Sequence, residues 1–292
     1  SPDLSNINVI RLIYEANNAP LDVFKIEAIK GKKAGIYMQF DDATIGQYEY
    51  AFPVMEKYGL RGTIAAPTER VGKNVGLSGE RVTWSQLREM QNAGWLVVSH
   101  GLDEKSLADL PDDELEYQLR KSSEMLFDRG FIFGSKCIVA PQSSWSDRVE
   151  QYARKYFAIS RNRGYGNTKR DVYPQNHPRH QKVIGPHNVT TDEIKSWIDG
   201  AIEHKQELAL SWHIVQPDEP EHNKNFWNTP EFLEEICAYI REKIDEGVLE
   251  CVTWQDTMLQ SKNIESIDNE GNEYLVYNDG KPTLLSLPIT QT

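Results

Sequence analysis

Acidic and imidazole side chains stand at the ends of several strand-like segments of this 292-residue sequence. Asp41 and Asp42 end the first segment, His100 ends the third, and His213 ends a later apolar run. Carboxylates and imidazoles exchange protons and bind divalent metals, so this set favours metal-assisted hydrolysis. Two other interpretations stay open: the acid pair could cap the next helix, and His213 could be a buried structural imidazole.

The segments that must position these residues alternate with helical patterns. Such alternation is typical of repeated βα units around a parallel sheet, and it predicts an α/β fold with a (β/α) barrel over residues 33–260. In such a barrel the catalytic groups come from the C-terminal ends of the strands. The expected strands are residues 34–41, 62–66, 95–100, 136–141, 157–161, 182–187, 208–215 and 248–254.

Helix starts are marked by residues that cap the first turn. Thr83 with Gln86, and Thr190 with Glu193, have the spacing of a capping box. Thr229 is followed by a proline and then by an apolar stripe at helical spacing. We therefore expect helices to begin at these three threonines.

Two flanks lie outside the expected barrel. Residues 1–32 form an N-terminal extension, and residues 261–292 form a polar C-terminal tail. Within the tail, an Asn-Asp-Gly turn separates residues 274–277 from residues 283–285, which predicts an appended β-hairpin.

Charge and composition exclude several functional classes. The 32 basic and 44 acidic residues give a net charge of −12, which argues against a nucleic-acid partner. No apolar run approaches the roughly 20 residues of a membrane span. The three cysteines have neither zinc-knuckle nor disulfide-framework spacing, and no phosphate loop, dinucleotide fingerprint or G-x-S-x-G motif is found. The chain begins Ser-Pro-Asp without a signal peptide, which leaves its compartment open. The sequence also leaves the oligomeric state open.

Four segments in order carry a resemblance to a known family. QFDDA at 39–43, HGLDEKSL at 100–107, Ala140-Pro141 and LSWH at 210–213 resemble the successive motifs of the NodB-homology polysaccharide deacetylases, carbohydrate esterase family 4. The resemblance covers about residues 34–259 and implies an irregular (β/α) barrel of about seven strands. It also implies a metal-dependent hydrolase that removes acetyl groups from N-acetylated, or O-acetylated, sugars of a polysaccharide or oligosaccharide, and it favours an extracellular or cell-surface protein.

The same resemblance assigns a role to each matching position. Asp41 matches the catalytic base, and His213 matches the general acid. Asp42 matches the first metal ligand, and His100 matches the first histidine of the ligand pair. The implied cofactor is a divalent metal, zinc first, with manganese and cobalt as alternatives.

The sequence departs from the family pattern at three positions. The second ligand histidine is replaced by Glu104, and the arginine that orients the base is replaced by Val139. Ala43 stands where a glycine is usual. Glu104 could still bind the metal through its carboxylate, with Asp103 or His187 as alternatives. Arg161, at the end of the next strand, could supply a guanidinium to Asp41 or could be a plain core-rim arginine.

The expected substrate-binding residues are Pro141, Trp145, Trp212 and Arg161, with buried packing as the alternative for Trp212. A second function stays open because of the departures: a carbohydrate-binding or adhesin-like module that has lost catalysis, as part of a larger extracellular or phage-tail assembly. A third is hydrolysis of another small amide or urea-like bond on the same scaffold.

Overall fold

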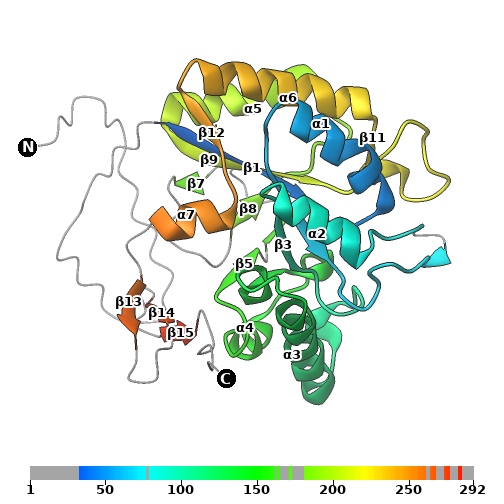
Figure 1. Cartoon of the computed structure of the whole chain (residues 1–292), viewed down its shortest axis with the longest axis vertical. Helices are drawn as coiled ribbons and strands as arrows, with labels where there is room; N and C mark the ends of the chain where they lie inside the picture. The colour runs from blue at the N-terminus through cyan, green and yellow to red at the C-terminus, as the bar shows by residue number, and fades with distance from the viewer. Residues whose placement is uncertain are drawn as a thin grey trace, which may run out of the picture.

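The computed structural model describes residues 33–260 apart from 77–78, 162, 165–170 and 173–180, together with three short strands nearer the C-terminus. Its centre is an eight-stranded sheet in the order β5-β4-β3-β2-β1-β9-β7, with β12 also paired to β1. Every pairing in this sheet is parallel except that of β7 with β9. The sheet curls into a half-barrel with helices on its outside (Figure 1), which confirms the predicted irregular α/β barrel.

The expected strands are present, most of them shortened at one or both ends. The strands of the sheet are β1 (Ala34–Phe40), β2 (Gly62–Ala66), β3 (Leu96–Ser99), β4 (Cys137–Val139), β5 (Ile159–Arg161), β7 (Asp171–Val172), β9 (Gln206–Trp212) and β12 (Leu249–Cys251). The segment expected at 182–187 contributes only β8 (Lys182–Val183), which pairs with β6 (Arg163–Gly164), and a bridge from Ile184 to Leu210. The run at 208–215 divides, because β10 (Ile214–Val215) pairs instead with β11 (Trp227–Asn228).

Three of the described helices, α2 (Trp84–Asn92), α5 (Thr191–His204) and α6 (Pro230–Asp245), begin directly after the capping threonines that predict them. The other described α-helices are α1 (Phe52–Lys57), α3 (Asp112–Asp128), α4 (Asp147–Ala153) and α7 (Trp254–Gln260). Thr83 and Thr190 each form a complete capping box with the residue three positions later. The Thr229 side chain accepts a hydrogen bond from the backbone of Phe232. These contacts satisfy backbone N–H groups that a helix start leaves unpaired.

Alternation along the strands divides the interior into two layers. On β1, Ile36, Met38 and Phe40 pack outward against the helices, whereas Tyr37 belongs to a second cluster on the inner face of the sheet. Gln39 lies between two outward-facing residues and is 1% exposed. Because successive side chains of a strand point to opposite faces, the inner face continues from Tyr37 through Gln39 to Asp41.

The C-terminal segment contains a small antiparallel sheet. Its strands are β13 (Ile264–Ile267), β14 (Glu273–Val276) and β15 (Pro282–Leu284). The pairing of β14 with β15 agrees with the predicted hairpin, although the turn itself lies outside the described residues, as does the extension at 1–32. The division of the chain into barrel, extension and tail stays a prediction.

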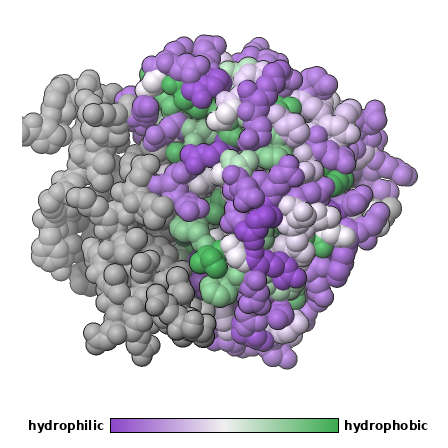
Figure 2. All heavy atoms as spheres, viewed as in Figure 1, coloured by the Kyte–Doolittle hydropathy of each residue, from purple (hydrophilic) through white to green (hydrophobic). Residues whose placement is uncertain are grey.

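The described surface is mostly hydrophilic on the face drawn in Figure 2. Among the described residues, the exposed large hydrophobic side chains are Tyr117, Ile132 and Phe226. No helix in this part of the chain has both the length and the apolar character that crossing a membrane requires.

Candidate active site

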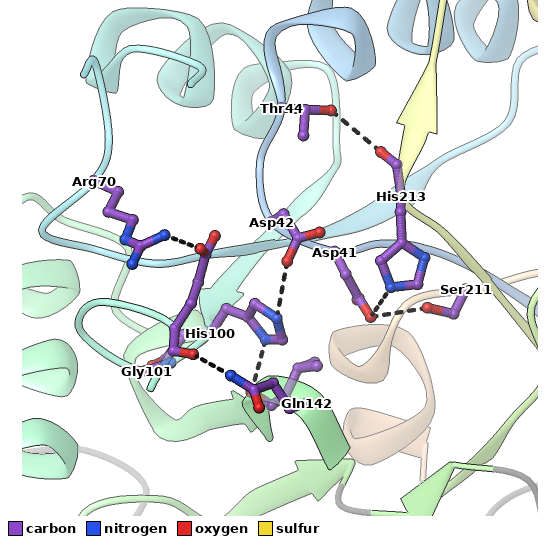
Figure 3. Close-up of polar contacts among 12 residues, drawn as sticks. Asp41, Asp42, Thr44, Arg70, His100, Gly101, Gln142, Ser211 and His213 are labelled. Carbon is purple, nitrogen blue, oxygen red and sulfur yellow. Dashed lines mark hydrogen bonds and ion pairs between the residues drawn. The ribbon is translucent and has the colours of Figure 1, made fainter. Parts of the chain in front are cut away.

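The predicted chemical residues meet at the C-terminal edge of the parallel strands. β1 and β9 are paired in register up to Phe40 and Trp212, so Asp41 and His213 follow on adjacent strands. The backbone N–H of Asp41 donates to the carbonyl of Trp212 over 2.8 Å. A cavity of about 1180 Å³ opens here and is lined by Asp41, Asp42, His100, Glu104, Arg161 and His213 among others. Figure 3 shows these strand ends converging.

Asp41 is a buried carboxylate held by two donors. Arg161 forms an ion pair with its Oδ2 atom, and the Ser211 hydroxyl donates to the same oxygen over 2.9 Å. The second amino group of Arg161 donates to Gln39 over 2.8 Å, which fixes the guanidinium. Burial alone would raise the pKa of Asp41, but the charges of Arg161, His213 and His100 outweigh it and hold the pKa well below its usual range. Asp41 is therefore an ionised carboxylate.

The position of Arg161 resolves one of the alternatives from the sequence. Arg161 is 6% exposed and bound to Asp41, so it supplies the guanidinium that Val139 cannot. The same contact argues against its predicted role in substrate binding, because its donors are engaged inside the protein. Asp41 Oδ1 is buried and has no hydrogen-bond partner among the described residues, which leaves that oxygen able to accept a proton.

His213 is held between Asp41 and a second histidine. Its Nε2 atom lies 3.6 Å from Asp41 Oδ2, and its Nδ1 atom lies 3.1 Å from Nε2 of His187. Thr44 and Gln47 donate to the backbone carbonyl of His213 over 3.2 and 2.6 Å. His187, an alternative metal ligand in the sequence, is instead the neighbour of the predicted acid.

Asp42 and His100 form the other half of the site. Asp42 Oδ1 lies 3.3 Å from His100 Nε2, and His100 Nδ1 lies 3.0 Å from the carbonyl oxygen of Val139. Because that carbonyl can only accept, Nδ1 carries a proton and Nε2 is the atom directed at Asp42. Burial lowers the pKa of His100. The hydrogen bond to Asp42 and the charges of Asp41 and Asp42 raise it by more, so the net shift of the pKa is upward. Burial also raises the pKa of Asp42, which the His100 hydrogen bond and charge reverse.

The backbone at this strand end has a conformation that few residues adopt. Asp42 and Ala43 have φ angles of 72° and 49°, in the left-handed region that favours glycine. The usual glycine of the family motif falls at Ala43, so the turn is kept although its side chain is different. Strained residues of this kind cluster at functional sites.

Glu104, the predicted third ligand, lies in a different set of contacts. Its carboxylate forms ion pairs with Arg70 and, over 3.0 Å, with Arg81. Gln142 donates to its backbone carbonyl over 3.1 Å, and its φ angle is 65°. Charge-assisted hydrogen bonds to two guanidinium groups compete directly with a metal for the carboxylate oxygens. We call Arg70, Glu104 and Arg81 the arginine clamp.

The predicted metal site is therefore incomplete. Asp42 and His100 present two donors with suitable chemistry, but the carboxylate of Glu104 is bound in the clamp. Asp103 does not replace it, because its Oδ2 atom lies 3.2 Å from Nζ of Lys105. Within the described part of the chain, no group of three or more His, Cys, Asp or Glu side chains could hold a metal ion. The predicted set of Asp42, His100 and Glu104 does not fit a zinc ion, which needs three protein ligands in catalytic sites.

The remaining predicted residues divide between the cavity and the core. Pro141 and Trp145 line the cavity, and the Trp145 indole N–H donates to Glu150 over 3.0 Å. Trp212 is fully buried on the outer face of β9, against Phe40 and Phe232, so the prediction that it binds substrate is wrong.

Several residues of the site were not predicted from the sequence. Gln39 could have been found, because strand alternation places it on the same face as Asp41. Asn228 comes from β11, and Arg70 and Arg81 come from the connection between β2 and α2, so their spacing in the sequence gives no signal.

The comparisons with known proteins agree with the resemblance seen in the sequence. A family model described as polysaccharide deacetylase matches residues 28–157. YxkH of Bacillus subtilis (strain 168), a protein named after the polysaccharide deacetylases, is 28% identical over 120 residues, 41% of this chain and 41% of that protein. The chain thus matches about two fifths of the length of this curated relative.

A solved structure of low sequence identity shares the fold. The Bc1960 peptidoglycan N-acetylglucosamine deacetylase is 14% identical, with a TM-score of 0.51 over 77% of this chain and 88% of that chain. A family 4 carbohydrate esterase from Streptomyces lividans is 15% identical, with a TM-score of 0.49 over 76% of this chain and 94% of that chain. The family match covers Asp41, Asp42, His100 and Glu104, and it confirms the resemblance of this part of the chain to the polysaccharide deacetylases.

Proposed function

We propose that this protein is a hydrolase that removes acetyl groups from the N-acetylated sugars of a polysaccharide. The observation that carries the proposal is the meeting of Asp41 and His213 at the wall of an open cavity, where Oδ2 of Asp41 lies 3.6 Å from Nε2 of His213. An ionised carboxylate beside an imidazole provides a base and an acid for the two proton transfers that amide hydrolysis needs.

The two residues act at different moments of the reaction. Asp41 takes a proton from a water molecule as the water oxygen forms its bond to the acetamide carbonyl carbon. His213, in its protonated form, gives a proton to the sugar nitrogen as the carbon–nitrogen bond breaks. The products are acetate and a free amino sugar, and each transfer of this kind contributes about 10²- to 10⁴-fold in rate.

A divalent metal, zinc first, is the cofactor that the resemblance implies. Asp42 and His100 offer donors for it, but the arginine clamp holds the expected third ligand. No step is therefore assigned to a metal, and metal dependence is a separate prediction with its own measurement.

The cavity has room for a short oligosaccharide. Its volume of about 1180 Å³ is slightly above the roughly 300–1,000 Å³ usual for small-ligand pockets. Trp145 and Phe226 line it and offer ring faces on which sugar rings can stack. One structure of similar fold is named as a peptidoglycan N-acetylglucosamine deacetylase, so we propose N-acetylglucosamine polymers as the first substrates to test.

The test is release of acetate from N-acetylglucosamine oligomers by the full chain. We expect release by the wild-type protein and a fall of at least about a hundredfold in His213→Gln, because the acid is lost. His204→Gln is the control, since His204 is exposed on α5 and remote from the site. Equal rates in wild type and His213→Gln would contradict the assignment of the acid.

Sugar binding without turnover is the second candidate function. The clamp on Glu104 supports it, because the family's third ligand position is diverted to two arginines. In that case the wild-type protein binds the same oligomers, measured by calorimetry, and releases no acetate at any metal concentration.

A further inference from the structure

A chain of hydrogen bonds extends behind His213, away from the cavity. His213 Nδ1 lies 3.1 Å from His187 Nε2, and His187 Nδ1 lies 3.0 Å from Asn228 Oδ1. The amide nitrogen of Asn228 donates to the carbonyl oxygen of Pro186 over 2.9 Å. The ring of Phe226 packs against both imidazoles, with centroid distances of 5.0 and 5.6 Å.

The direction of each bond in this chain follows from its last member. A backbone carbonyl only accepts, so the contact with Pro186 requires the NH₂ group of Asn228 at that position. Oδ1 of Asn228 therefore faces His187, and an amide oxygen also only accepts. It follows that His187 Nδ1 carries a proton and donates it to Asn228.

The same reasoning continues to His213. A neutral imidazole has one protonated nitrogen, so with the proton on Nδ1 the Nε2 atom of His187 can only accept. Burial and the neighbouring charge of His213 lower the pKa of His187 to about 4, so His187 is neutral at neutral pH. The donor in the His187 to His213 contact is then Nδ1–H of His213.

We propose that Asn228 and His187 are positioning residues that fix a proton on Nδ1 of His213, so that Nε2 is the atom that exchanges protons during the reaction. The catalytic role of His213 in this inference rests on the proposed function. The position of its proton on Nδ1 follows from the hydrogen bonds and does not depend on that function. Nε2 is the atom directed at Asp41, 3.6 Å away. The charged groups near this side of His213 include Asp41, at the end of β1, Arg161 of β5, which is bound to the same carboxylate, and Asp42.

This arrangement gives the acid a simple cycle. The imidazolium of His213 has protons on both nitrogens, and loss of the Nε2 proton to the sugar nitrogen leaves a neutral ring that is already protonated on Nδ1. The Nδ1–H bond to His187 is the same before and after the transfer, so the ring does not need to rotate. The proton that Asp41 took from water can then pass to Nε2 and restore the starting state.

The direct test is ¹⁵N nuclear magnetic resonance of the imidazole nitrogens in the full chain, without substrate. The signals of His213 are assigned by their loss in His213→Gln. In the wild-type protein, we expect the form of His213 that has a single ring proton to carry it on Nδ1. His187→Leu removes the acceptor and should release the proton to a mixture of both nitrogens. His187→Gln offers an amide oxygen that can accept in place of the ring nitrogen and should restore the Nδ1 proton.

Activity provides a second readout that separates the two proposals. If the protein releases acetate, His187→Leu should lower kcat at least about tenfold with little change in KM, and His187→Gln should recover part of the loss. Absence of acetate release with the expected tautomers would remove the proposed function and leave this inference standing. A His213 proton on Nε2 in the wild type, or one that stays on Nδ1 in His187→Leu, would overturn the inference. Thermal unfolding of each variant verifies that it is folded.

Discussion

The two halves of the site each lack a residue that is usual in the family, and the side chains around the two positions differ. In the half that contains Asp41 and His213, Val139 stands at the position of the family's arginine, and Arg161 from β5 forms the ion pair with Asp41 instead. In the half that contains Asp42 and His100, the replacement Glu104 is drawn into the arginine clamp. The difference teaches that a buried charge must find a partner, and that the partner decides whether the group is available for chemistry.

The half with Asp41 and His213, to which the proposed function assigns the proton transfers, is a connected network, and the half with Asp42 and His100 is not. Arg161, Ser211 and His213 all surround one carboxylate, and His187 and Asn228 continue the network behind His213. Asp42 and His100 contact each other and lack a third ligand among the described residues. We therefore expect substitutions in the first half to have larger effects than substitutions in the second.

The largest effect is expected for Asp41→Asn. The amide cannot take the water proton, so acetate release should fall by about 10³-fold or more. The measurement is kcat/KM on N-acetylglucosamine oligomers, with Glu203→Gln, an exposed residue of α5, as control. A fall of less than tenfold would mean that the network around Asp41 serves structure rather than catalysis.

Loss of Arg161 should be the most destabilising single change at the site. Arg161→Met leaves the Asp41 carboxylate buried without its guanidinium, and removal of one partner of a buried ion pair costs about 3–5 kcal/mol. The free energy of unfolding in urea measures it. Arg120→Gln is a matched control, because its pair with Glu124 is exposed and should contribute less than about 1 kcal/mol. Equal losses of unfolding free energy in the two variants would mean that Arg161 does not stabilise the buried carboxylate of Asp41.

Metal binding tests the other half of the comparison. We expect the wild-type protein to bind zinc weakly, with little change in Asp42→Ala, because the clamp holds Glu104. Glu104→His combined with Arg81→Met should add a third ligand without leaving Arg81 unpaired, and zinc affinity should rise by on the order of a hundredfold. The measurement is competition with a chromophoric chelator. Stoichiometric zinc in the wild type that is lost in Asp42→Ala would show that the clamp opens around a metal.

Sequence patterns predicted most of the fold and the core of the site, for identifiable physical reasons. Strand alternation and capping threonines are local signals, and parallel strands bring their C-terminal ends to one edge, so Asp41, His100 and His213 were expected at the same edge of the sheet. The alternation also places Trp212 on the face opposite His213, which agrees with its burial in the outer core.

The clamp and the His187 network could not be predicted in the same way. Arg70 and Arg81 lie 34 and 23 residues before Glu104, in a connection whose path depends on tertiary packing. The same holds for Asn228, which is 41 residues from His187. The sequence showed that a glutamate stands at the position of the second ligand histidine. It did not show that Arg70 and Arg81 bind this glutamate.

The smallest expected effect is on stability against acid, and it isolates the proton-transfer half. Burial, then the charge of His213, lower the pKa of His187 from its ordinary value of 6.5 to about 4, so the unfolded chain binds this proton more tightly than the folded protein. The contribution of His187 is fully present above pH 6.5 and is lost as the pH falls toward 4, with a slope of at most about 1.4 kcal/mol per pH unit. The pKa of His100 is raised, so its own contribution is constant below pH 6.5 and does not mask this window. Urea unfolding between pH 4 and 6.5 should show a shallower slope in His187→Gln than in the wild type, whereas the control His204→Gln should keep the wild-type slope. Identical slopes in all three proteins would mean that folding does not hold His187 in its neutral form. His187 would then not belong to the hydrogen-bonded network behind His213.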